Sequence, residues 1–140
     1  MSTSSMITVL PLSMLYLSLL SSLAIFLTFS VVKIRMKTSI GLSHGDNEDL
    51  TRQIRVQANL LENLLPFSLL FILLELNGFY PMFLHSVGLA FLLARLSHAY
   101  GFSMTSGASK GRYYGTVVTW VSIIALIAVN LYLAIMSFFG

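Results

Sequence analysis

Long apolar segments constrain what this chain can fold into. The first of them, residues 10–32, contains 23 residues and no charged side chain. A helix needs about 20 apolar residues to cross the hydrocarbon core of a bilayer. Only 9% of the chain is charged, whereas soluble domains carry about 25% charged residues. These properties exclude a soluble globular protein and indicate an integral membrane protein.

Turn-forming residues divide the chain into four expected helices within a single domain, residues 1–140. No Lys or Arg precedes the first apolar segment, so we expect a retained helix and not a cleaved signal peptide. Asn77-Gly78 and Pro81 mark a short turn, and a Ser- and Gly-rich stretch follows at residues 103–111. The sequence predicts an all-α membrane protein, a four-transmembrane-helix bundle. Its helices are expected at approximately 6–35, 48–76, 81–102 and 112–139.

The basic residues outside the apolar segments predict the orientation of the bundle. Five of them lie between the first two helices and two lie between the last two: Lys33, Arg35, Lys37, Arg52, Arg55, Lys110 and Arg112. Cytoplasmic loops of membrane proteins carry an excess of Lys and Arg. We therefore expect loops 33–55 and 103–112 in the cytoplasm and both termini outside. The basic residues form no continuous patch, which argues against a nucleic-acid partner.

The second helix carries a polar stripe within its apolar sequence. At about 100° per residue, Arg52, Arg55, Asn59, Glu62 and Pro66 fall within an arc of roughly 80°. A charged side chain near the centre of a membrane helix costs about 2.5–3.5 kcal/mol, so these residues are candidates for function. The stripe has two open interpretations: an internal ion pair or capping network, or a functional site.

The polar residues outside this stripe give weaker evidence for a functional site. Glu75 lies on another face near a helix end and is expected to be a snorkelling interface residue. Arg95 and His98 share a face of the third helix, whereas His85 points nearly opposite to His98, so we expect no two-histidine metal or haem site. The acidic loop that follows His44 lacks calcium-loop spacing and is expected to be a solvated turn that caps the second helix. No cysteine is present, and we predict no metal site.

Three motifs occur in an informative order. They are Arg52-x-x-Arg55-x-Gln57-x-Asn59-x-x-Glu62-Asn63-x-x-Pro66-Phe67, then Arg95-x-x-His98, then an arginine near the start of a fourth helix. This order resembles the MAPEG family, the membrane-associated proteins in eicosanoid and glutathione metabolism. The family includes microsomal glutathione transferases, leukotriene C4 synthase and microsomal prostaglandin E synthase. The segments 75–78 and 95–102 are most similar to its small bacterial inner-membrane branch.

The resemblance implies a homotrimer in a bacterial inner membrane, with glutathione as co-substrate in a cleft between neighbouring subunits. It implies a glutathione-dependent transferase or peroxidase that acts on hydrophobic electrophiles, with a hydrophobic small molecule or lipid as second partner. Arginine forks suit the carboxylates of glutathione, and a buried glutamate suits its ammonium. By resemblance, the tripeptide is held by Arg55, Gln57, Asn59 and Glu62, the cleft is lined by Arg95 and His98, a further cation comes from Lys33 or Arg35, and the thiolate is stabilised by Arg112.

The sequence also departs from the family pattern. Phe102 and Asn63 stand where some members have tyrosine, and Lys33 stands where some have arginine. These departures weaken assignment to a particular eicosanoid enzyme but leave the glutathione residues in place. The alternative is a non-enzymatic lipid-binding or scaffold protein of the same fold. A small four-helix drug exporter is disfavoured, because such exporters rely on a glutamate in the first helix and residues 10–32 contain no acid.

Overall fold

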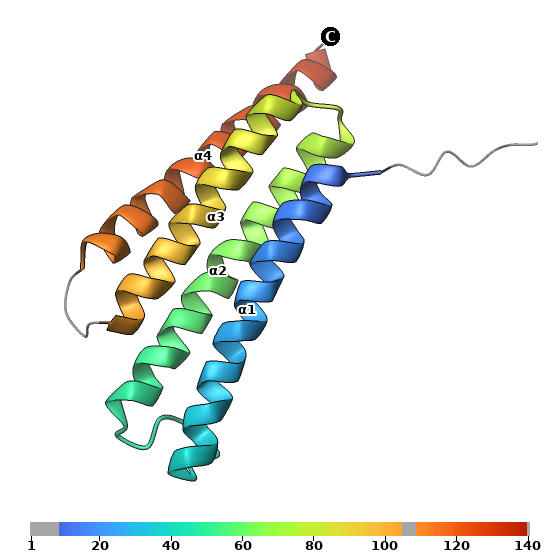
Figure 1. Ribbon diagram of the computed structural model, residues 1–140. Coiled ribbons are helices and arrows are strands. Elements are labelled where there is room, and N and C mark those ends of the chain that lie inside the picture. The colour runs from blue at the N-terminus through green and yellow to red at the C-terminus, as the bar shows by residue number, and fades with distance from the viewer. Residues whose placement is uncertain (1–8, 105–108, 140) are drawn as a thin grey trace, which may run out of the picture.

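The computed structural model describes residues 9–104 and 109–139, and the side chains of residues 102–104 lie outside the description. Within these residues the chain forms four helices and no strand: α1 (Pro11–Thr38), α2 (Glu48–Leu76), α3 (Pro81–Met104) and α4 (Lys110–Phe139) (Figure 1). Each helix is long and apolar enough to cross a membrane. The predicted four-helix membrane bundle is confirmed.

Local sequence explains where the helices begin and end. Pro11 occupies the first turn of α1, where the N–H that proline lacks would have no partner in the helix. Asn47 caps α2, because its side chain accepts a hydrogen bond from Leu50 N at 2.8 Å. Gly78, with a φ of 65°, lies in the short turn before α3. The first helix begins at Pro11, so residues 9 and 10, which were expected within it, lie outside the helix, and the expected start at residue 6 lies outside the described residues. The helix ends at Thr38, three residues later than expected.

The central helices α2 and α3 hold the bundle together. α1 contacts both of them and so does α4, whereas the described parts of α1 and α4 do not contact each other. Aromatic side chains fill the core, where the rings of Phe67 and Phe91 stack with centroids 3.7 Å apart. Tyr16 is buried and its ring packs against Gly88. A Cβ atom at position 88 would lie only 2.5 Å from this ring. Glycine at this position therefore allows α1 to approach α3.

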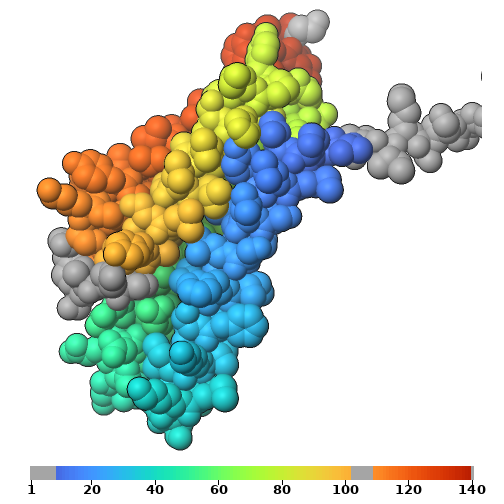
Figure 2. Space-filling model, in the orientation of Figure 1, coloured from blue at the N-terminus to red at the C-terminus, as the bar shows by residue number. Residues whose placement is uncertain are grey.

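The two ends of the bundle differ in charge and shape. α1 begins and α4 ends beside the α2–α3 turn, and the other two connections lie at the opposite end (Figure 1). The opposite end carries all the Lys and Arg residues except Arg95, and we call it the basic end. Here α1 and α2 project beyond α3 and α4 and leave a step, which Figures 1 and 2 show. This grouping agrees with the cytoplasmic orientation that we predict for both connections.

Glu75 corrects one prediction. Its carboxylate accepts hydrogen bonds from the backbone N–H groups of Leu12, at 2.9 Å, and Ser13, at 2.7 Å. The first N–H groups of a helix have no partner within it, and negative charge is favourable at this end. Glu75 therefore ties the end of α2 to the start of α1, and the prediction of a snorkelling residue was wrong. Helical periodicity identified the face that carries Glu75 but not the helix end opposite it.

Candidate functional site

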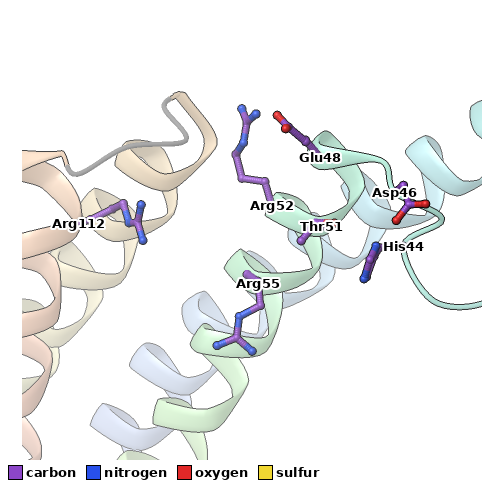
Figure 3. A pocket seen from close by; sticks show the side chains of 7 residues that line it. All are labelled: His44, Asp46, Glu48, Thr51, Arg52, Arg55 and Arg112. Carbon is purple, nitrogen blue, oxygen red and sulfur yellow. The ribbon is translucent and has the colours of Figure 1, made fainter.

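A cavity of about 550 Å³ lies at the basic end of the bundle. Charged side chains from three segments surround it, and Figure 3 shows Arg112 pointing from α4 toward α2 across the opening. Its lining contains three guanidinium groups and two carboxylates, so it can bind both negatively and positively charged groups of a ligand. The lining residues are His44, Asp46, Glu48, Thr51, Arg52, Arg55 and Arg112.

The first turns of α2 supply two of the arginines. Arg52 and Arg55 are three residues apart, so they lie on neighbouring parts of one face. Arg52 pairs with Asp49 at 3.1 Å, which leaves Arg55, exposed in the single chain, as the α2 cation without a carboxylate partner in the described residues. The cavity thus retains positive charge that a bound anion can neutralise.

The connection between α1 and α2 forms another wall. Arg35 Nη1 donates hydrogen bonds to three carbonyl oxygens of this loop, those of Ile40, Gly41 and Ser43, at 3.0–3.3 Å. The loop then passes through left-handed conformations at Gly45 (φ 53°) and Asp46 (φ 57°). Arg35 therefore braces the loop that places His44 and Asp46 at the cavity, and it does not line the cavity itself.

Close contact with α3 positions Arg112. A Cβ atom at Gly111 would lie 2.9 Å from Ser97 O, and one at Gly115 would lie 2.7 Å from Ala94 O. The two glycines flank Arg112 and bring the first turns of α4 directly against the backbone of α3. Glycine and other small residues let membrane helices approach in this way. We call this contact between α3 and the first turns of α4 the seam. Because the seam fixes the backbone of α4, it also fixes the position of the Arg112 Cα atom beside the cavity.

A second polar cluster lies inside the bundle, behind the α2 stripe. Arg95 is 1% exposed and its guanidinium joins three helices. Nη2 donates to Asn59 Oδ1 at 2.8 Å and lies 3.4 Å from His98 Nδ1, and Nη1 donates to Thr119 Oγ1 at 3.4 Å. Among the described residues no carboxylate lies within 4 Å of Arg95. Arg95 and His98 thus lie beside Asn59 and not on the wall of the cavity.

The remaining predicted site residues are spread over α1 and α2. Glu62, the middle residue of α2, is exposed on the single chain, and in the described part it pairs neither with Arg55 nor with any other cation. The internal ion pair that the stripe left open is therefore not formed. Gln57 Nε2 donates to Thr28 Oγ1 on α1 at 2.7 Å, and Lys33 is exposed on α1.

The structure thus brings two predicted residues, Arg55 and Arg112, to one cavity and adds others that the sequence did not identify as site residues. Arg52 could have been identified from the sequence, because it belongs to the polar stripe of the second helix. His44 and Asp46 lie in an irregular loop, where no periodicity indicates direction. Across the described ranges, no group of three or more His, Cys, Asp or Glu side chains is arranged to hold a metal ion.

Comparison with known proteins adds an independent finding. The MAPEG family matches residues 13–132 of the chain. Inner membrane protein YecN of Escherichia coli K12 is 29% identical over 120 residues, which cover 86% of this chain and 90% of that protein. The protein of the same name from Escherichia coli O6:H1 matches to the same extent.

Proposed function

The chain belongs to the MAPEG family, and on this basis we propose that it is a membrane-bound glutathione-dependent transferase or peroxidase acting on hydrophobic electrophiles. The observation that carries the proposal is the cavity at the basic end, which is lined by Arg52, Arg55 and Arg112. We place the chain in a bacterial inner membrane, because it has four membrane-spanning helices and its relatives are named inner membrane proteins.

The charges and size of the cavity suit glutathione. This tripeptide carries two carboxylates, one ammonium and one thiol. Arginine binds carboxylates through paired, charge-assisted hydrogen bonds, and Arg55 and Arg112 come from different helices, so they can meet different parts of one ligand. A cavity of 550 Å³ falls within the range of about 300–1,000 Å³ that is common for small-molecule sites.

Glu62 supports a ligand and a neighbouring subunit on the same face. It is exposed at the middle of α2 and unpaired within the described residues. Leaving an ionised carboxylate against lipid costs several kcal/mol, so such groups face a bundle interior, a partner or a polar cleft. We propose that the ammonium of glutathione meets Glu62 in a cleft shared between subunits of a homotrimer. In this assembly Lys33 of α1, which is also exposed, supplies a cation to the cleft.

Arg112 is the residue that we assign to the chemistry. A thiol with a pKa of about 8.5 is only a few per cent ionised at about pH 7. Lowering the pKa of the glutathione thiol to about 6.5 needs about 2.7 kcal/mol of preferential stabilisation of the thiolate. A guanidinium at the edge of the bilayer, beside the positive N-terminal end of α4, supplies this stabilisation. The ionised form is the nucleophile.

The reaction then follows from the thiolate. With an alkyl or aryl electrophile, the sulfur attacks carbon, a C–S bond forms, and the leaving group departs with the bonding electron pair. With a hydroperoxide, the sulfur takes the terminal oxygen, the alcohol leaves, and a second glutathione converts the sulfenic acid to a disulfide and water. Because the helices face lipid, a hydrophobic electrophile can reach the thiolate from the bilayer without passing through water.

A specific observation favours a second candidate, a non-enzymatic lipid-binding or scaffold protein of the same fold. Asn63 stands where some members of the family have tyrosine, and its amide donates to Asn59 O of its own helix at 2.8 Å. Position 63 therefore offers no phenolic hydroxyl for a substrate or a thiolate. Calorimetry and catalysis distinguish the two candidates.

The test is isothermal calorimetry of the detergent-purified protein with glutathione, followed by conjugation of 1-chloro-2,4-dinitrobenzene. The enzyme requires saturable binding and a rate above that of the uncatalysed reaction. Binding without conjugation would favour the scaffold, and no binding would refute the glutathione site altogether. Cavity variant Arg55→Gln, matched with Lys37→Gln as a change of the same charge outside the cavity, assigns the binding to the cavity.

A further inference from the structure

The hydrogen bond between Arg95 and Asn59 determines the orientation of the Asn59 side-chain amide. Arginine has five N–H donors and no acceptor. The atom of Asn59 that lies 2.8 Å from Arg95 Nη2 must therefore be the amide oxygen. This assignment depends on chemistry and not on which way round the amide was placed, so the NH2 group of Asn59 necessarily points away from Arg95.

The NH2 group of Asn59 belongs to the polar stripe of α2. Asn59 is one turn from Arg55 and three residues from Glu62, on the same arc. Its side chain is half-buried, between the interior, where Arg95 is 1% exposed, and the outer face, where both neighbours on the stripe are exposed. In the described part of the chain, no group accepts a hydrogen bond from Asn59 Nδ2. A donor is thus presented where Arg55 and Glu62 face outward.

Arg95 keeps this polarity fixed. Rotating the Asn59 amide by 180° would place its NH2 against a guanidinium that cannot accept, inside a region where an unpaired polar group is costly. Arg95 is held in turn by Thr119 on α4 and lies against His98 on α3. The amide therefore has one orientation, and it presents its NH2 group, a donor, on the side away from Arg95.

We propose that Arg95 is a positioning residue that makes Asn59 a hydrogen-bond donor to an oxygen of the ligand. This inference rests on the proposed function, in which the ligand is glutathione. The group that meets Asn59 is then a carboxylate or a peptide carbonyl, and the ammonium is excluded from this position and left to Glu62. Position 59 selects ligands that present an anionic or carbonyl oxygen between the Arg55 cation and the Glu62 anion.

Two substitutions of Asn59 separate this role from a structural one. Asn59→Asp keeps an oxygen for Arg95 and replaces the outward NH2 with a second acceptor oxygen. Asn59→Ala removes the outward donor and also leaves Arg95 without its partner. Thermal unfolding should therefore rank Asn59→Asp above Asn59→Ala. Glutathione affinity, measured by calorimetry, should rank them in the opposite order. We expect a loss of about tenfold for alanine, from the missing hydrogen bond, and at least about tenfold more for aspartate, from repulsion between like charges.

Matched variants complete the test. Gln53→Glu adds the same charge on another face of α2, outside the lining of the cavity, and we expect a loss of about threefold or less. Arg95→Lys, still donor-only, should bind like the wild type, whereas Arg95→Gln lets the amide rotate and should bind more weakly. If wild type binds glutathione and Asn59→Asp binds as tightly as Asn59→Ala or more tightly, the inference is overturned alone. If wild type does not bind glutathione, the proposed function is overturned and this inference with it.

Discussion

Replacing Gly115 with alanine tests how α3 positions the start of α4. Gly115 is buried where the two helices cross, and a Cβ atom there would lie 2.7 Å from Ala94 O, 2.8 Å from His98 Cβ and 3.0 Å from His98 N. Ordinary van der Waals contact begins at 3.4 Å, so the closest contact is about 0.7 Å too short. The atoms that it meets belong to the backbone or to a Cβ, and none of them can rotate away.

α4 must therefore move away from α3 in the Gly115→Ala variant. Overpacking of this kind costs about 1–3 kcal/mol of unfolding free energy. Arg112 is three residues before Gly115 on the same helix, so the shift also moves its guanidinium relative to the cavity. A misplacement of about 1 Å can reduce a catalytic rate about 100-fold, and a shift of 0.7 Å should reduce glutathione conjugation by about tenfold or more.

Two assays in mild detergent measure these effects: thermal unfolding followed by circular dichroism, and conjugation of 1-chloro-2,4-dinitrobenzene. Gly41→Ala is the control, because a Cβ atom at Gly41 meets nothing within 4 Å and its backbone is not left-handed. We expect the control to retain the stability and rate of the wild type. A Gly115→Ala protein with unchanged stability and unchanged rate would refute the argument that the seam positions Arg112.

Three further predictions concern the site, the assembly and the opposite end of the bundle. Glu62→Gln removes the anion proposed for the glutathione ammonium and should weaken binding by about tenfold or more; unchanged affinity in calorimetry would remove Glu62 from the site. Native mass spectrometry should show a homotrimer, since the exposed charges of α2 need a neighbour, and a monomer or dimer alone would contradict the shared cleft. Glu75→Gln keeps one acceptor oxygen for the start of α1 and should cost about 1–2 kcal/mol of stability without changing glutathione affinity. A loss of affinity equal to that of Glu62→Gln would show that the two ends are coupled.

Hydrophobicity and turn residues were sufficient to predict the fold. The cost of unsatisfied backbone groups in lipid permits few structures other than helices to span a membrane, so the number of apolar segments gave the number of helices. The turn at Asn77 and Gly78, with Pro81 after it, predicted the end of α2 and the start of α3 where the structure has them. The ends of α1 at Pro11 and Thr38 differ from the prediction where the sequence changes gradually from apolar to polar. The end of α3 and the start of α4 also differ, each by two residues.

The site was less accessible to sequence reasoning, because periodicity identifies a face but not its neighbour. The stripe on α2 was visible in the sequence, yet Asn59 meets Arg95 36 residues away and Glu75 meets Leu12 63 residues away. Only the folded bundle shows these contacts. His44 lies in a loop whose path depends on the hydrogen bonds from Arg35, and no local pattern encodes that path.

The central claim is that this chain binds glutathione as a thiolate stabilised by Arg112. Ultraviolet difference absorbance of the thiolate, recorded at neutral pH on the protein with glutathione, tests it most directly when wild type is compared with Arg112→Met. We expect a thiolate signal for the wild type and none for the variant, with affinity for the tripeptide within about tenfold, because the lost interaction belongs mainly to the ionised sulfur. Raising the pH should restore the signal in Arg112→Met, since the thiol then ionises without help. A wild type that binds glutathione without a thiolate signal, or an Arg112→Met variant that keeps the signal at neutral pH, would contradict the claim.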